Sequence, residues 1–184
     1  LLTHLHFDHG GGCTRGTGEE AELEFPDATH YVQDRQWAWA HDPEVLDRAS
    51  FLEDNLRPLE ESEQLVLLDG PGSPFPGLEL LVVDGHTRGQ QLLKIKGIDH
   101  TLLYAADLFP TTAHLPPRWN MAFDVAEMET LAEKTDVLEQ AVQEEWTLFF
   151  EHDPEIEIAE VERTDRTYQA LRPRALDALT ESSA

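Results

Sequence analysis

Three histidines and one aspartate stand within six residues near the start of the chain, at His4, His6, Asp8 and His9. Neutral imidazole nitrogens and carboxylate oxygens are the ligands that suit zinc and similar divalent first-row metals. In an extended loop, the alternate placement of His4 and His6 lets both side chains point the same way, whereas Asp8 and His9 project elsewhere. Interleaved apolar residues distinguish the segment from an affinity tag. The segment therefore predicts ligands for two neighbouring metal ions.

Two metal sites need further ligands, and three candidates each follow an apolar run that is typical of a buried strand. These are His86 after the run 78–83, Asp107 after 101–106 and His152 after 146–151. Loops that are carried by a rigid sheet commonly assemble metal sites. We therefore expect these side chains to meet the N-terminal histidines.

In this order the residues resemble the metallo-β-lactamase superfamily, whose pattern is H-x-H-x-D-H, then a His in a GHT-like turn, an Asp and a final His. The resemblance implies that His4, His6 and His86 hold one metal, that Asp8, His9 and His152 hold the other, and that Asp107 bridges them. It implies two divalent ions, zinc first, with manganese, iron or cobalt as alternatives. His9 in the fourth position of the first motif resembles the hydrolytic members.

The fold that the resemblance implies is an α/β (α+β) four-layer αββα sandwich. In this fold, several strands of the first sheet normally precede the H-x-H-x-D-H loop, whereas here the motif begins at His4 and residue 1 is Leu. We therefore expect residues 1–184 to form a single domain from which the N-terminal part of the first sheet is missing. An unpaired sheet edge and an exposed apolar face would make the isolated chain prone to aggregation.

The segments 106–114 and 149–154 resemble bacterial hydrolases that are grouped with the quorum-quenching lactonases and phosphotriester hydrolases. We expect a dinuclear metal-dependent hydrolase in which a metal-bridging hydroxide attacks a lactone or a carboxylic ester. The alternatives are a phosphotriesterase, a glyoxalase II-like thioester hydrolase and a non-catalytic metal-binding fragment. Glyoxalase II is disfavoured because basic residues are few and little chain follows His152.

Several residues near the predicted centre are candidates for roles in catalysis. Asp107 would help to orient the hydroxide, and Asp8 would take a proton through its free carboxylate oxygen. His114 would hydrogen-bond a substrate or leaving group, or else is an ordinary loop histidine. Asp153 would orient the ring of His152 or His9. The apolar candidates for a pocket, each equally compatible with core packing, are Phe7, Phe109, Trp119 and Met121.

Composition narrows the choice of partners. With 37 acidic and 13 basic residues the formal net charge is −24, which repels phosphate backbones and argues against nucleic acid as a partner. No apolar run approaches the roughly 18 residues that a membrane span needs. Cys13 is alone, so nothing indicates an oxidising compartment and we expect a cytoplasmic location. The expected partner is a small ester or lactone, and the oligomeric state is open, with a homodimer among the alternatives.

Apolar periodicity predicts the elements that position these residues. Strands are expected at 29–33, 64–68, 78–83, 91–96 and 101–105, with a further strand pair at about 147–150 and 156–161. Helices are expected at 35–40, from Pro43 to about Leu56 with an end before Pro58, and from about 124 to 146. The long helix would turn an apolar stripe of Met128, Leu131, Leu138 and Val142 inward. The tail from Arg163 has apolar residues at helical spacing.

Overall fold

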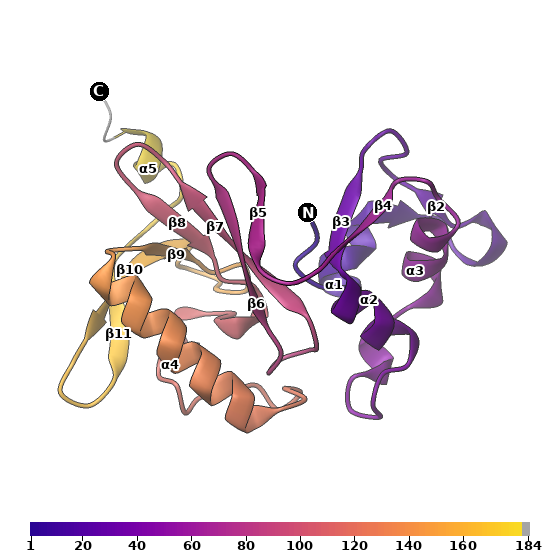
Figure 1. The fold of residues 1–184 in the computed structure, drawn as a ribbon. Helices are drawn as coiled ribbons and strands as arrows, with labels where there is room; N and C mark the ends of the chain where they lie inside the picture. Colours follow the sequence, from indigo (N-terminus) through magenta and orange to yellow (C-terminus); the bar gives the residue numbers. More distant parts are fainter. Residues whose placement is uncertain (182–184) are drawn as a thin grey trace.

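The computed structural model describes residues 1–181, and its largest element is a seven-stranded sheet (Figure 1). The strands lie in the order β11-β10-β9-β8-β7-β6-β5. Their bounds are β5 Gly72–Phe75, β6 Leu78–Val83, β7 Gln90–Lys96, β8 Thr101–Tyr104, β9 Thr147–Phe149, β10 Ile158–Arg163 and β11 Tyr168–Arg174. Only β8 and β9 are parallel neighbours; all the other pairs in this sheet are antiparallel. The predicted strands at 78–83, 91–96, 101–105 and 147–150 are confirmed to within one residue at each end, and the one at 156–161 is shifted by two.

One face of this sheet is covered by the long helix α4, Glu127–Gln143 (Figure 1). The larger core of the molecule lies between them, because apolar side chains of the helix and of six strands are buried together. Its members include Val137, Leu138 and Ala141 from the helix and Leu92, Leu103, Leu148 and Val161 from the strands. This core fixes the sheet on which three of the candidate ligands are carried.

The predicted inward stripe of this helix is wrong in part. Met128 is 75% exposed, whereas the buried positions are Thr130, Lys134, Val137, Leu138 and Ala141. The orientation follows from Lys134, whose Nζ donates to the carbonyl oxygens of Pro116 at 3.3 Å and Trp119 at 2.8 Å. These hydrogen bonds satisfy the ammonium group, and the stem of the side chain is apolar. Lys134 can therefore be buried on the inner face of the helix, although it is not part of the predicted apolar stripe.

The other half of the molecule is built around a small parallel sheet of β3, His30–Gln33, and β4, Leu65–Leu68. Helices α2, Asp34–His41, and α3, Glu53–Glu60, lie beside it (Figure 1). A separate, smaller core contains Leu2, Leu5, Val32, Ala40, Leu56 and Leu59. The molecule therefore has α4 on one outer side and α2 and α3 on the other. The seven-stranded sheet and the two-stranded sheet of β3 and β4 lie between them (Figure 1).

Short elements complete the N-terminal half. They are α1 Phe7–Gly10, the hairpin strands β1 Thr14–Arg15 and β2 Glu22–Leu23, and 3-10 turns at Gly11–Cys13, Gly18–Glu20 and Arg48–Ser50. Two more 3-10 turns lie at Ala106–Leu108 and Thr112–His114. Cys13 is half-buried against the smaller core, as a small packing residue.

The predicted helix from Pro43 to about Leu56 is wrong in both of its bounds. Residues 43–52 form turns, and α3 begins at Glu53 and continues through Pro58 to Glu60. A proline inside a helix removes one N–H and so one hydrogen bond to the residue four positions earlier. Here Leu56, Pro58 and Leu59 are all buried, and burial of this apolar face outweighs the lost bond.

The tail after Arg163 forms a strand, although its apolar residues have helical spacing. Residues Tyr168–Arg174 form β11, which pairs with β10 in an antiparallel hairpin and places the ring of Tyr168 in the larger core. Without β11, β10 would expose unpaired N–H and C=O groups at the edge of the sheet, which explains why this segment forms a strand. In the described part of this tail, up to residue 181, helical structure is restricted to α5, Ala178–Glu181.

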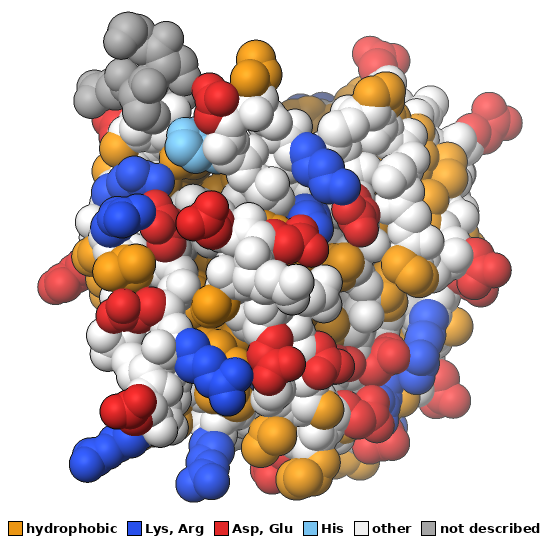
Figure 2. Space-filling model, turned by 60° about the vertical axis from the view of Figure 1, so that its left-hand side comes forward, with side chains coloured by type: hydrophobic (Ala, Val, Ile, Leu, Met, Phe, Trp, Pro, Cys, Tyr) orange, Lys and Arg blue, Asp and Glu red, His pale blue; other side chains and the backbone are white. Residues whose placement is uncertain are grey.

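The surface carries the strong acidity of the composition. Figure 2 shows acidic side chains spread across one face of the molecule, with lysine and arginine side chains scattered among them. Within residues 1–181, no helix has the length and apolarity needed to cross a lipid bilayer.

Candidate metal centre

Three candidate ligands come from one edge of the large sheet. β6 and β8 are both antiparallel to β7, and β8 is parallel to β9, so β6, β8 and β9 all end at the same edge. His86, Asp107 and His152 each lie three positions beyond the last residue of one of these strands, Val83, Tyr104 and Phe149. The predicted convergence of strand-end residues therefore follows directly from the topology.

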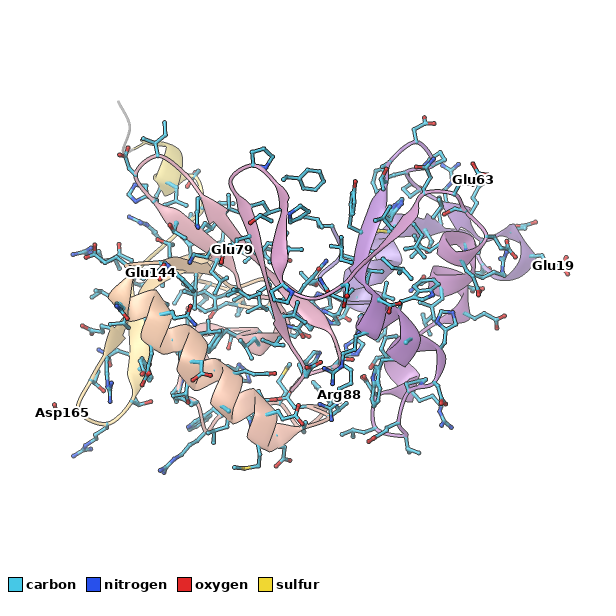
Figure 3. All side chains as sticks on the ribbon, viewed as in Figure 1. Glu19, Glu63, Glu79, Arg88, Glu144 and Asp165 are labelled. Carbon is cyan, nitrogen blue, oxygen red and sulfur yellow. The ribbon has the colours of Figure 1, made fainter. Side chains whose placement is uncertain are left out.

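The turn that carries His86 is fixed against α4. A Cβ atom on Gly85 would lie 2.3 Å from the backbone nitrogen of Thr130, so only glycine allows this approach. Arg88, at the same turn, donates from Nη1 to Glu129 of the helix at 2.6 Å (Figure 3). The close packing and the ion pair hold the turn that carries His86 against α4.

The N-terminal loop is held between the two halves of the molecule. The backbone nitrogen of Leu2 donates to Tyr31 of β3 at 2.9 Å, and the nitrogen of Gln91 in β7 donates to the carbonyl oxygen of Thr3 at 2.8 Å. The side chain of Gln36 accepts from the nitrogen of Leu5 at 3.0 Å and donates to the carbonyl oxygen of Arg88 at 2.6 Å. These bonds place the H-x-H-x-D-H segment over the sheet edge.

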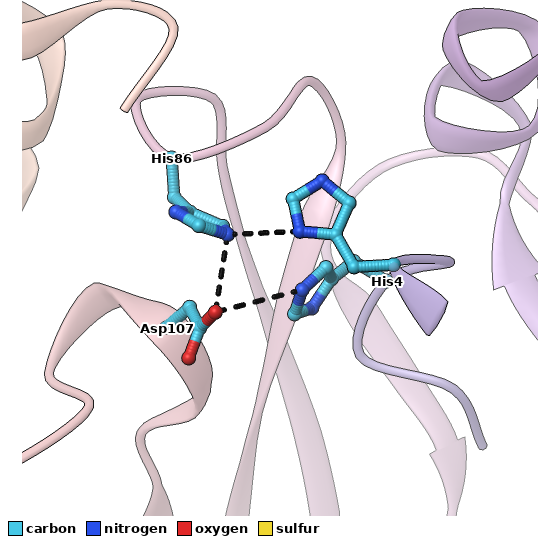
Figure 4. Close-up of side chains that lie close together, drawn as sticks. His4, His86 and Asp107 are labelled. Carbon is cyan, nitrogen blue, oxygen red and sulfur yellow. Dashed lines mark hydrogen bonds and ion pairs between the residues drawn. The ribbon is translucent and has the colours of Figure 1, made fainter. Parts of the chain in front are cut away.

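Four buried side chains meet there, and we call them the buried cluster: His4, His6, His86 and Asp107 (Figure 4). Nε2 of His86 lies 3.2 Å from Nδ1 of His6 and 3.2 Å from Oδ2 of Asp107. Nε2 of His4 lies 3.8 Å from the same carboxylate oxygen. Three imidazole nitrogens and one carboxylate oxygen thus face a common point.

The other nitrogen of each buried histidine is held by an outer partner. Nδ1 of His86 lies 2.9 Å from Oδ1 of Asp124, and Nε2 of His6 lies 2.7 Å from Oδ1 of Asp47. Nδ1 of His4 lies 3.1 Å from Oγ1 of the neighbouring threonine, Thr3. Such partners fix the tautomer and orientation of a histidine and leave its inner nitrogen available to a metal. Neither Asp47 nor Asp124 stands in a sequence pattern that would have indicated this role.

A second group lies beside the first, and we call it the open cluster: His9, Asp107, Glu151 and His152. Nε2 of His152 lies 3.2 Å from Oδ1 of Asp107 and 3.1 Å from Nε2 of His9. Nε2 of His9 lies 3.3 Å from Oδ2 of Asp107. The side chain of His152 is 39% exposed, so this half of the centre reaches solvent. Asp107 is the only residue common to both clusters.

Asp8 lies at the rim of the open cluster rather than inside it. Its Oδ2 is 3.6 Å from Nε2 of His9 and 3.9 Å from Nε2 of His152, and its side chain is 44% exposed. Glu151 instead stands within the ligand-sized group, with a side chain that is 10% exposed. Glu151 was not among the predicted site residues, although its position directly before the final histidine was a usable signal.

The backbone at Asp107 is specialised. The preceding residue, Ala106, has a φ of 46°, in the left-handed region that non-glycine residues seldom adopt. With its amide oxygen turned inward, Gln90 accepts from the backbone nitrogens of Asp107 and Leu108, both at 3.1 Å. Strain of this kind persists where surrounding contacts impose it, commonly at functional sites. Here it turns the Asp107 carboxylate between the two clusters.

The electrostatics of the centre are dominated by burial and by Asp107. Burial opposes protonation of His86, but its hydrogen bonds to Asp107 and Asp124 prevail and raise its pKa to about 9. Burial would raise the pKa of Asp107, yet the surrounding imidazoles hold it well below its usual range. Burial and then the neighbouring histidines lower the pKa of His4. The site thus combines a carboxylate whose ionised form is favoured with tightly grouped imidazoles.

The remaining candidates lie outside both clusters. His114 is half-buried in the 3-10 turn Thr112–His114, where its Nδ1 lies 2.9 Å from Oγ1 of Thr111; burial and then Lys134 lower its pKa. Phe109 is in the larger core, whereas Phe7 and Trp119 are 52% and 66% exposed.

The prediction that Asp153 orients a histidine ring is wrong. Its Oδ2 accepts from the backbone nitrogen of Thr112 at 2.9 Å and from the Thr112 hydroxyl at 2.7 Å, and its Oδ1 accepts from Glu155 and Ile156. These hydrogen bonds tie the turn after His152 to the loop that carries His114. The Asp153 carboxylate is therefore directed away from the rings of His9 and His152.

The residues present fit two divalent metal ions. Nε2 of His4 and Oδ1 of Asp107 are buried without a hydrogen-bond partner, although buried polar atoms are nearly always satisfied. The donors are nitrogens and carboxylate oxygens, the set that zinc accepts. The shared carboxylate matches a dinuclear arrangement. A cavity of about 340 Å³ adjoins the open cluster and is lined in part by Leu1, Leu2 and Leu93.

Comparison with solved structures supports the fold. The chain is similar to a probable metal-dependent hydrolase from Staphylococcus aureus, with 26% identity and a TM-score of 0.76 over 94% of this chain and 62% of that one. It is similar to AidC, a dizinc quorum-quenching lactonase, with 19% identity and a TM-score of 0.76 over 95% and 63% of the two chains. It is similar to the hydrolase AbOPH of the beta-lactamase superfamily, with 20% identity and a TM-score of 0.79 over 96% and 64%.

This chain therefore spans 62–64% of the length of these three structures. Neither protein-family models nor curated proteins match the sequence. The structural likeness confirms the α/β metallo-β-lactamase fold that the resemblance implied.

Proposed function

From the metallo-β-lactamase fold and its paired histidine and carboxylate clusters, we propose that this protein is a dinuclear metal-dependent hydrolase of lactones or carboxylic esters. The observation that carries the proposal is the position of Asp107 between the clusters: its Oδ2 lies near both His86 and His9, and its Oδ1 lies near His152. A carboxylate shared by two adjacent ligand groups can bridge the two ions of a dinuclear hydrolytic centre.

The proposed ligand sets follow the metallo-β-lactamase pattern, which includes all of the buried cluster and, at the open cluster, takes Asp8 from the rim in place of Glu151. His4, His6 and His86 would hold one ion, His9, His152 and Asp8 the other, and Asp107 would bridge them. Two ions bound there supply a water of lowered pKa and a Lewis acid for the substrate oxygen. Zinc is the first candidate, in keeping with the dizinc lactonase neighbour.

The chain's own groups can handle the proton and the leaving group. The exposed carboxylate of Asp8 stands at the rim, between Nε2 of His9 and Nε2 of His152, where it can accept a proton from solvent-facing groups. His114 lies on the loop that follows Asp107, and its lowered pKa keeps the ring neutral near pH 7, able to donate one hydrogen bond to a leaving group.

Two features support a small neutral substrate. The cavity beside the open cluster combines leucine side chains with the polar groups of Asp8, His9 and His152, as an acyl chain attached to a polar ester would require. The net charge of −24 disfavours polyanionic substrates such as nucleic acid.

The test is elemental analysis of the purified protein together with a screen of lactone and aryl-ester hydrolysis, with and without a chelator. We expect two metal ions per chain and turnover that the chelator abolishes. Bound metal without turnover would favour a non-catalytic metal-binding fragment. Absence of bound metal after loading would overturn the ligand assignment.

A further inference from the structure

Glu151 is a buried carboxylate that the metallo-β-lactamase ligand pattern leaves without a role. It comes directly before His152, after the end of β9, and its side chain is 10% exposed. Its Oε1 lies 3.4 Å from Nδ1 of His9. Both of its carboxylate oxygens are buried without a hydrogen-bond partner. The phenol of Tyr104 on β8 is a further polar neighbour, because burial and then the Glu151 carboxylate raise the pKa of Tyr104.

The two nitrogens of His9 face different groups. Nε2 lies 3.3 Å from Oδ2 of Asp107 and 3.1 Å from Nε2 of His152, so it faces the centre of the open cluster. Nδ1 faces Glu151 on the opposite side of the ring. The carboxylate therefore approaches the ring nitrogen that does not face the proposed metal position.

The buried cluster shows the same arrangement three times. His4, His6 and His86 each direct one nitrogen inward and hold the other on an oxygen of Thr3, Asp47 and Asp124 respectively. Glu151 is related to His9 as Asp124 is related to His86. A carboxylate behind a ligating histidine fixes its tautomer and raises the basicity of the inner nitrogen.

We propose that Glu151 is a positioning residue for the metal of the open cluster. It accepts the Nδ1–H hydrogen bond of His9 and so keeps the Nε2 lone pair directed at that metal, while the Tyr104 hydroxyl holds the carboxylate in place. The proposal rests on the dinuclear site proposed above. In this arrangement Asp8, which is near Nε2 of His9, supplies the carboxylate ligand, and Glu151 does not bind the ion.

The experiment compares variants by the affinity of the second ion, measured by chelator competition and by the absorption spectrum of the Co²⁺-loaded protein. Glu151→Ala should lower the affinity of the second ion by about 10- to 100-fold and leave the first ion unchanged. Glu151→Gln keeps an oxygen that can accept from Nδ1–H, so it should restore most of that affinity. Tyr104→Phe should have a smaller effect in the same direction.

The controls separate this proposal from its competitors. His152→Ala, which removes a proposed ligand, should eliminate the second ion. If Glu151→Ala and Glu151→Gln both eliminate it in the same way, Glu151 is a ligand and the positioning role is wrong. Unchanged affinity in Glu151→Ala would overturn any role. Wild-type protein that binds two ions without hydrolysing any substrate would contradict the proposed function alone, because the affinity comparison does not depend on turnover.

Discussion

The two halves of the proposed metal centre share one carboxylate but differ in burial. His4 and His86 are 0% and 2% exposed, whereas His152 of the open cluster is 39% exposed. The outer partners of the buried half come from distant parts of the chain, at Asp47 and Asp124. The buried half is thus part of the interior where the two halves of the molecule meet, and the open half is the side that a substrate can reach.

This difference in burial implies that the buried half contributes to the stability of the fold, whereas the open half gives a substrate access to the centre. A buried imidazole whose outer nitrogen is bonded to a buried carboxylate cannot be removed without leaving that carboxylate unpaired. An exposed imidazole at a loop end can be removed while water replaces its contacts. Substitutions in the two halves should therefore have different consequences, and the shared Asp107 should affect both.

The largest effect is expected for Asp107→Ala. Because this carboxylate faces both clusters, its removal should reduce binding of both ions, and a loss of several kcal/mol in transition-state stabilisation corresponds to roughly a 10³-fold fall in kcat/KM or more. Metal stoichiometry and lactone hydrolysis measure the two effects. A variant that retains one tightly bound ion and full activity would show that the halves are independent.

The contrast in burial predicts a contrast in stability between His86→Ala and His152→Ala. The first leaves the buried carboxylate of Asp124 without its imidazole partner and should lower the free energy of unfolding by about 1–3 kcal/mol or more. The second changes a partly exposed side chain and should cost within about 0.5 kcal/mol. Urea denaturation of the metal-free proteins makes the measurement, and equal losses would contradict the distinction.

A substitution at an outer partner should affect one half alone. Asp124→Asn keeps the shape of the side chain but removes the charge that stabilises His86, so the affinity of the buried ion should fall by about 10- to 100-fold. The ion at the open cluster should be unaffected, because Asp124 contacts none of its members. Chelator competition that shows equal weakening of both ions would indicate coupling between the halves.

The two halves also differ in how much could be predicted from sequence. The convergence of His86, Asp107 and His152 was predictable, because each follows an apolar run and strand ends gather at one sheet edge. Asp47 and Asp124 were not predictable, since a single aspartate in a loop has no local signal and only the tertiary fold brings it to a histidine. Burial of the inner histidines therefore depends on residues that sequence analysis could not select.

The fold shows the same limit at its less regular elements. The strands that pack on both sides were predicted from their apolar runs. The strand at Tyr168–Arg174 was not, because its apolar residues also fit a helix and the free edge of β10 decides between them. The inward face of α4 was assigned incorrectly because hydropathy does not represent a lysine whose ammonium is satisfied by backbone carbonyls.

That lysine gives the smallest expected effect and a test specific to the buried half. Lys134 binds the carbonyl oxygens of Pro116 and Trp119 on the loop that leads from His114 to Asp124, and burial lowers its pKa to about 8. The unfolded chain, with a lysine pKa of about 10.4, binds more protons than the folded chain between those values, so the contribution of Lys134 to stability rises with pH across this window.

The variant Lys134→Met removes this titration and isolates it from the many carboxylates. The difference in free energy of unfolding between wild type and variant should increase by on the order of 1 kcal/mol from pH 7.5 to 10, a value reduced from the full pKa difference because the two carbonyls favour the charged amine. Urea midpoints at several pH values measure it. Lys134 holds the loop beside the buried half. Lys134→Met should therefore lower the affinity of the ion in that half more than the affinity of the ion in the open half. A pH-independent difference would mean that the amine remains charged throughout, held by the carbonyls alone.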